Sequence, residues 1–163
     1  MAKSKNIYGL PIKKEDFDVA VSDPRAHHDH YKESIDFPLP EGTDILAAAD
    51  GNVTSYKDDS NQGGNDRKYI GRANFVTLQH ENDELTQYLH LKYKGITRKV
   101  GDVVKRGEVI GYSGNTGYST EPHLHFMVIR KNDTEIGWET LEPQFEEKIE
   151  VLRNPKKTGS NNV

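Results

Sequence analysis

Residues 74–91, NFVTLQHENDELTQYLHL, decide the fold of this chain. Two runs rich in β-branched and aromatic residues, 74–80 and 85–91, flank a turn signal at Asn82-Asp83. Short runs of this composition, bounded by turn residues, are typical of β-strands. The stretch therefore predicts two strands joined by a turn.

The same texture extends to both sides of this stretch. From about residue 34 to residue 130, short apolar runs are separated by Gly, Asn and Asp, which is typical of an all-β domain. Further turn signals stand at Glu41-Gly42 and Asp50-Gly51. The predicted strands are 34–37, 45–48, 51–57, 74–80, 85–91, 108–113 and 123–130. We expect them to close into a small sandwich or barrel.

The segments around these strands divide the chain into four parts. Residues 1–24 are predicted to be an N-terminal extension, and 25–131 a β-domain. Residues 132–152 are predicted to be a C-terminal extension that packs on the domain, with a short helical stretch at about 142–151. The composition of 153–163 predicts a flexible tail.

Composition excludes several classes of protein. A chain of 163 residues has the size of one domain. Its net charge of -4 argues against a general nucleic-acid binder. Because the chain has no cysteine, any metal must be held by nitrogen and oxygen ligands. No stretch approaches the length of a membrane span, and the N-terminal residues lack the apolar core of an export signal. We expect a monomer.

Histidines give the main indication of function, since most of the seven stand in tight contexts. His123 and His125 are two residues apart in a predicted strand, so both side chains reach the same face. A neutral imidazole serves as a zinc ligand and as a general base near neutral pH. In residues 88–91, alternation places Tyr88 and His90 on one face and the leucines on the other, which suits a pocket wall.

A second group of candidates stands in residues 25–37, RAHHDHYKESIDF, which contain His27, His28, His30 and Asp36. Asp36 lies between two apolar residues, so alternation turns its carboxylate away from the core. Two histidines and one carboxylate make a typical open zinc site with a fourth position for water. We therefore expect one Zn²⁺ per chain. A nearby histidine that is not a ligand is suited to take a proton or to stabilise an oxyanion.

The order of these motifs resembles the lysostaphin/LytM-type zinc endopeptidases, whose known members cut peptide bonds in bacterial cell-wall peptidoglycan. The resemblance covers about residues 27–130 and implies a compact antiparallel β-sandwich or barrel of the duplicated hybrid motif type. Three stretches carry the resemblance, namely SIDFPLPEGTDILAAADGNV (34–53), NFVTLQHENDELTQYLHL (74–91) and VGDVVKRGEVIGYSGNTGYSTEPHLHF (100–126). The last of them is the most specific.

The resemblance implies a role for each matching residue. Asp36 and His125 correspond to zinc ligands. His90 and His123 correspond to the two catalytic histidines that do not bind the metal, with His123 as general base and His90 helping to stabilise the oxyanion. Asn74 corresponds to a residue that lines the substrate groove.

The first zinc ligand departs from the commonest pattern. Many members carry it four residues before the aspartate, where this chain has Lys32. His27, His28 and His30 are therefore all candidates. His27 is favoured because longer-loop members have a histidine about nine residues before the aspartate. His30 is the next candidate, since it keeps strand parity with Asp36.

The expected function is zinc-dependent hydrolysis of peptide bonds in peptidoglycan cross-links. Two alternatives remain: a non-catalytic wall-binding or activator module of the same fold, and a zinc peptidase that acts on a peptide outside the wall. The family implies an extracellular or cell-wall location, while the N-terminal residues show no signal peptide. A phage-borne enzyme and a trimmed signal are both compatible with that.

Overall fold

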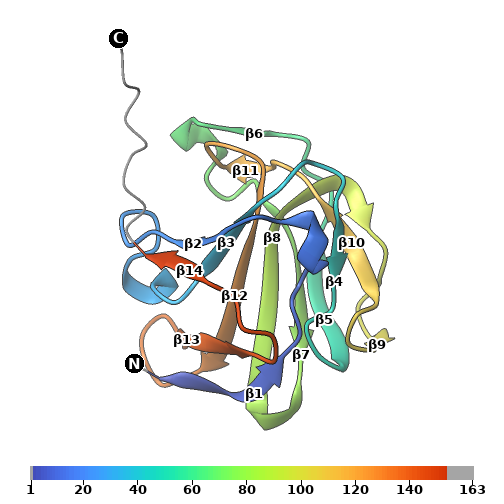
Figure 1. The fold of residues 1–163 in the computed structure, drawn as a ribbon. Helices are drawn as coiled ribbons and strands as arrows, with labels where there is room; N and C mark the ends of the chain where they lie inside the picture. The colour runs from blue at the N-terminus through green and yellow to red at the C-terminus, as the bar shows by residue number, and fades with distance from the viewer. Residues whose placement is uncertain (1, 154–163) are drawn as a thin grey trace.

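The computed structural model describes residues 2–153, and β12 (His123–Lys131) runs through the centre of its main sheet (Figure 1). The remaining strands within these residues are β1 (Lys3–Tyr8), β2 (Ala20–Ser22), β3 (Ile35–Pro38), β4 (Asp44–Leu46), β5 (Gly51–Lys57), β6 (Gly63–Gly64), β7 (Asn74–Gln79), β8 (Glu84–Ile96), β9 (Val103–Val104), β10 (Val109–Ser113), β11 (Gly117–Tyr118), β13 (Trp138–Phe145) and β14 (Val151–Arg153). The helices of the described part are short 3-10 turns, namely η1 (Lys14–Asp16), η2 (Asp29–Tyr31), η3 (Arg67–Tyr69) and η4 (Glu81–Asp83).

The main sheet has the strand order β14-β2-β3-β12-β8-β7-β5-β9. From β2 to β9 every neighbouring pair is antiparallel. β13 pairs with β12 and β1, and β10 pairs with β4 and β8. β6 and β11 form a separate two-stranded sheet. The prediction of an antiparallel all-β domain is confirmed. All seven predicted strands are present, as β3, β4, β5, β7, β8, β10 and β12.

β12 shows how the sheet separates the core from the site. Leu124 and Phe126 are fully buried in the core, and His123 and His125 project from the opposite face because side chains alternate along a strand. Burial of each large apolar side chain stabilises the fold by roughly 1.5–3 kcal/mol. The core includes Phe37, Ile45, Val76, Leu78, Tyr88, Leu91, Ile110, Leu124, Phe126 and Val128.

The helical stretch predicted at 142–151 is wrong, because this segment belongs to β13 and β14 and to the bend between them. β13 pairs antiparallel with β12, and its Leu141, opposite Val128, is fully buried. On its other side β13 pairs in parallel with β1. Intrinsic preference for a helix is weak, so pairing on both sides and burial of Leu141 override it.

Both ends of the described chain take part in the sheets. β1 lies along β13, and the buried Glu84 carboxylate accepts hydrogen bonds from the main-chain N–H groups of Lys5 and Asn6. β2 lies before the predicted boundary after residue 24, β14 lies after the one following residue 131, and the two strands pair with each other. These domain boundaries stay predictions. The predicted tail at 153–163 lies outside the described residues except for Arg153, which ends β14.

His80, directly after β7, takes part in a buried series of hydrogen bonds. Its Nδ1 lies 2.8 Å from the Asp50 carbonyl and its Nε2 lies 2.7 Å from Thr86 Oγ1. Thr86 is hydrogen-bonded to the Tyr88 hydroxyl, which accepts the main-chain N–H of Ala48 at 2.9 Å. Burial lowers the pKa of His80 below its ordinary value, although the Asp50 carbonyl opposes the shift.

This environment makes the stability of the metal-free protein depend on pH. As pH falls below 6.5, the ordinary pKa of histidine, the unfolded chain takes up the His80 proton before the folded chain does. The free energy of unfolding should therefore drop between pH 7 and pH 5 more steeply in the wild type than in His80→Gln, by at most about 1.4 kcal/mol per pH unit. Chemical denaturation at several pH values measures both slopes. Parallel slopes would contradict this role.

Candidate metal centre and active site

The Asp36 carboxylate stands at the centre of the site. β3 and β12 are paired so that Asp36 lies directly opposite His125. Ile35 and Phe37 are buried in the core, and alternation turns Asp36 to the other face, as the sequence predicts. Asp36 Oδ1 lies 3.0 Å from His125 Nδ1. The register of two strands thus brings together two residues that are far apart in the sequence.

His27 approaches the other carboxylate oxygen from the loop between β2 and β3. The Asp23 carbonyl accepts hydrogen bonds from the main-chain N–H groups of Ala26 and His27, at 3.0 and 2.7 Å, and so forms a tight turn. The imidazole after this turn points inward and is 4% exposed. Its Nε2 lies 3.1 Å from Asp36 Oδ2, and its ring meets the His125 ring edge to face.

The other two candidates for the first ligand lie elsewhere. His28 is exposed, and its Nδ1 lies 2.8 Å from the Asp29 carboxylate. His30 packs edge-on against Trp138, with ring centroids 5.0 Å apart. Of the three histidines left open by the sequence, the structure brings His27 into the donor group.

The donor atoms fit a small divalent cation. One atom from each of His27, Asp36 and His125 lies within 4.8 Å of the other two. The two nitrogen–oxygen separations of 3.0 and 3.1 Å are close to the edge of about 3.3 Å that tetrahedral zinc with bonds of about 2.0–2.1 Å requires. Two imidazoles and one carboxylate are also the donor set of an open catalytic zinc site.

The same contacts determine the ionisation of Asp36. Burial disfavours the charged carboxylate, but hydrogen bonds from His125 and His27 outweigh burial and hold the pKa of Asp36 well below its ordinary value. Asp36 is therefore an anion at neutral pH, as a metal ligand must be.

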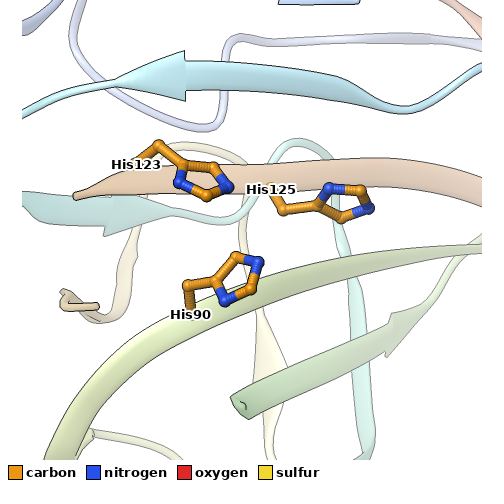
Figure 2. Close-up of side chains that lie close together, drawn as sticks. All are labelled: His90, His123 and His125. Atoms are coloured by element: carbon orange, nitrogen blue, oxygen red, sulfur yellow. The ribbon is translucent and has the colours of Figure 1, made fainter. Parts of the chain in front are cut away.

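Two further histidines lie next to this group. Figure 2 shows His123 and His125 projecting from β12, and His90 on β8 pointing toward them. The ring centroid of His90 lies 4.6 Å from that of His123 and 6.1 Å from that of His125. His123 Nε2 is 3.6 Å from Asp36 Oδ1. The site therefore holds four histidines around one carboxylate.

His90 reaches this face through a bulge in β8. Its neighbours Leu89 and Leu91 pair with consecutive residues of β7, so His90 is an extra residue in the strand. Its φ of 65° is in the left-handed region, which costs a side chain other than glycine about 1–3 kcal/mol. The buried positions pass from Tyr88 directly to Leu91. The prediction that Tyr88 and His90 share a face is wrong, because the bulge turns His90 away from the core.

Main-chain carbonyls determine where His90 and His123 carry a proton. His90 Nδ1 donates to the Thr116 carbonyl at 2.6 Å, and His123 Nδ1 donates to the Glu121 carbonyl at 2.8 Å. Because a carbonyl only accepts, each neutral ring keeps its Nε2 unprotonated. Burial, together with His123 and His125, lowers the pKa of His90 to about 3. His90 is therefore neutral at pH 7.

Thr116 is a supporting residue that the sequence reasoning misses. Its carbonyl accepts from His90, and its hydroxyl donates to the Leu91 carbonyl at 2.7 Å, so it holds both sides of the bulge. The signal in the sequence is the pair of glycines around it. A Cβ on Gly114 or Gly117 would lie within 3 Å of the neighbouring main chain. Their absence of a side chain lets the Thr116 segment pack closely.

Asn74 is fully buried beside this segment. Its side-chain amide accepts from Ser60 N at 3.0 Å and donates to the carbonyls of Ser60 and Leu91 at 2.8 and 3.3 Å. Its main-chain N–H donates to Thr116 Oγ1. That Asn74 lines a substrate groove stays a prediction. In this arrangement it acts on the site through the segments that it holds.

A mostly antiparallel β-domain with this donor group and two adjacent histidines has the architecture of a metallopeptidase domain. The chain belongs to peptidase family M23, since the sequence model of that family matches residues 30–137. The family resemblance found in the motifs is thus confirmed. His27 and Trp138 lie just outside the matched residues.

Individual relatives agree with this family. Peptidoglycan DD-endopeptidase ShyA of Vibrio cholerae is 39% identical over 112 residues, which are 66% of this chain and 23% of ShyA. Lysostaphin of Staphylococcus simulans is 39% identical over 100 residues, which are 60% of this chain and 17% of lysostaphin. This chain thus spans about a fifth of the length of these curated relatives.

Solved structures give the same result. A zinc-containing peptidase from Vibrio cholerae has a TM-score of 0.58 and 28% identity, over 76% of this chain and 36% of that chain. The catalytic domain of lysostaphin from Staphylococcus simulans has a TM-score of 0.51 and 26% identity, over 85% of this chain and 88% of that domain.

The geometry predicts which histidine supplies the first metal ligand. His27→Ala should weaken zinc binding by more than about 100-fold, because a directly bound ligand contributes more than its outer partners do. His28→Ala, a matched change one residue away, should leave zinc affinity unchanged. Competition with a chromogenic chelator measures both dissociation constants. Wild-type affinity in His27→Ala, with loss of zinc in His28→Ala or His30→Ala, would refute this geometry.

Proposed function

We propose that the protein is a zinc-dependent endopeptidase that hydrolyses peptide bonds in peptidoglycan cross-links. The observation that carries this proposal is the Asp36 carboxylate held between His27 and His125, with His90 and His123 beside it. Membership of family M23 supports peptidase chemistry. Relatives named as peptidoglycan endopeptidases support the choice of substrate.

Each residue of the donor group has a defined part in holding the ion. A zinc ion bound by His27, Asp36 and His125 supplies Lewis acidity, which lowers the pKa of a water ligand from about 15.7 to about 7 and polarises the scissile carbonyl. Asp36 contributes a negative charge at neutral pH, since its pKa is held low. The two imidazoles contribute nitrogen donors, His27 next to Asp36 Oδ2 and His125 next to Asp36 Oδ1. We expect one ion per chain.

His123 is the general base in this proposal. Its Nδ1 proton is engaged by the Glu121 carbonyl, and Ser119 Oγ lies 3.2 Å from the same nitrogen. These contacts fix the ring so that the unprotonated Nε2 faces Asp36. From there it can take a proton from the attacking water and later deliver it to the leaving amine. A base placed in this way contributes about 10²–10⁴-fold to the rate.

Neutral His90 is not in the protonation state that stabilising an oxyanion requires. Neutral His90 donates its one proton to Thr116, so its Nε2 first accepts a hydrogen bond. His90 becomes a donor toward the substrate oxygen only after it takes up a proton. Its ring is 4.6 Å from that of His123, the base that takes up a proton in this proposal. We propose that His90 stabilises the oxyanion by taking up a proton as the negative charge develops, since that charge favours the protonated ring despite its low pKa.

The place of action follows from the substrate. Among residues 2–153 there is no helix with the length and apolar character needed to cross a membrane. Hydrolysis of peptidoglycan requires contact with the cell wall, so we propose action outside the cell membrane. The monomeric state stays a prediction.

Substitution of the two histidines on β12 separates metal binding from catalysis. His123→Ala should keep about one zinc per chain and lose about 10²–10⁴-fold in hydrolysis of purified peptidoglycan. His125→Ala should lose the zinc as well. Zinc is measured by elemental analysis, and hydrolysis by mass spectrometry of the new peptide termini.

His28→Ala serves as the control in this experiment and should behave as the wild type. Undiminished hydrolysis by His123→Ala would show that His123 is not the general base. Zinc-loaded wild type that releases no new termini would contradict the enzyme and favour a non-catalytic wall module. Cleavage of other peptides without cleavage of peptidoglycan would favour a substrate outside the wall.

A further inference from the structure

We infer that residues 138–153, here called the C-terminal clamp, hold the loop that carries His27 and thereby set the metal affinity of the site. This loop, residues 23–34, is called the ligand loop. The inference rests on the proposed function only for the role of His27 as a metal ligand. The clamp lies beyond the residues that match the family, which end at 137.

His27 needs an external support more than the other two ligands do. Asp36 and His125 stand on paired strands. His27 stands on a loop, and its Nδ1 is buried without a hydrogen-bond partner among residues 2–153. A metal-binding histidine usually donates a hydrogen bond from its second ring nitrogen to a carboxylate, carbonyl or water, which fixes the orientation of the ring. The orientation of His27 therefore depends on how the ligand loop is held.

The clamp holds the start of the ligand loop through β14. β14 pairs in parallel with β2, the strand that leads into the loop, over the whole of β2. β14 lies near β2 in Figure 1, and the strand order β14-β2-β3 places it on the side of β2 away from β3. Ala20 and Ser22 of β2 are buried. The position of the loop at its first residue is thus fixed by a strand from the end of the described chain.

Trp138 holds the middle of the ligand loop. Its ring packs against His30 and Tyr31 of η2, with centroid distances of 5.0 and 5.6 Å. The Tyr31 ring in turn lies 6.2 Å from the ring of His125. Edge-to-face contacts of this kind favour a defined relative orientation of the rings. Trp138 therefore restrains the loop directly beside the metal group.

Arg153 and Thr140 hold the end of the ligand loop through Glu33. The Glu33 side chain is 3% exposed, and its Oε2 lacks a hydrogen-bond partner in the described part of the chain. Arg153 Nη1 lies 4.0 Å from this oxygen and supplies the counter-charge that a buried carboxylate requires. The main-chain N–H of Glu33 donates to Thr140 Oγ1 at 3.4 Å.

These three supports explain how the chain accommodates its unusual ligand spacing. His27 stands nine residues before Asp36, and Lys32 occupies the commoner position of the first ligand. A longer loop has more conformations to lose when it is ordered. The clamp removes part of this freedom before the metal binds, so Arg153 and Trp138 act as positioning residues.

The test measures zinc affinity and loop order in the full chain. Arg153→Ala and Trp138→Ala should each weaken zinc binding by about 10- to 100-fold, the range seen for residues that orient a metal ligand. Arg153→Lys should recover part of the loss. Glu33→Gln should also recover part of it when combined with Arg153→Ala, since glutamine needs no counter-charge. Arg98→Ala, which breaks the Arg98–Glu108 pair, is the matched control and should bind zinc as the wild type does.

Hydrogen exchange in the metal-free protein provides a second measurement that does not depend on zinc. Amides of the ligand loop should exchange faster in Arg153→Ala and Trp138→Ala, while those of β12 keep their protection and show that the fold is intact. Unchanged zinc affinity and unchanged loop exchange in both variants would overturn the clamp. A wild type that binds no zinc would overturn the proposed function, and loop exchange would then decide on the clamp alone.

Discussion

The contact of the Asp36 carboxylate with His27 and His125 is the interaction on which the rest of the site depends. A half-buried carboxylate is stable only when hydrogen bonds or opposite charges compensate for lost hydration. Here two imidazoles do so, one at each carboxylate oxygen, and they keep the pKa of Asp36 low. A shift of one residue between β3 and β12 would turn these side chains into the core. Core and site are therefore specified by the same strand register.

The chain divides its functional residues between rigid and adaptable parts. Asp36, His123 and His125 stand on central strands, which hold them with little freedom. His90 depends on a local bulge that the Thr116 segment supports. His27 depends on a loop whose start follows the β2–β14 pair and whose His30 packs against Trp138. The precision of the site thus decreases from the sheet centre toward the loop.

Much of this arrangement could be predicted from the sequence, because alternation is a local property. The alternation of side chains along a strand predicted the shared face of His123 and His125 and the outward turn of Asp36, and local composition predicted the central strands. The family motifs then supplied expected roles. Among His27, His28 and His30 the family spacing favoured His27, but local alternation could not decide, since nothing in a loop sequence states which ring turns inward. The position of His90 also escaped prediction, because a bulge breaks the alternation on which the reasoning relied.

The C-terminal strands were missed for another reason. β13 pairs with β1, and β14 pairs with β2, so each depends on a partner more than a hundred residues away. Local composition carries no record of such partners, and weak helix preference suggested a helix at 142–151 instead. Long-range pairing decides the structure of this part of the chain.

Anomalous diffraction at the zinc edge from crystals of the zinc-loaded protein tests the central claim most directly. The account predicts one strong peak within about 2.0–2.2 Å of His27 Nε2, an Asp36 oxygen and His125 Nδ1. Absence of a peak between these three side chains, or zinc bound instead through His28 or His30, would contradict it.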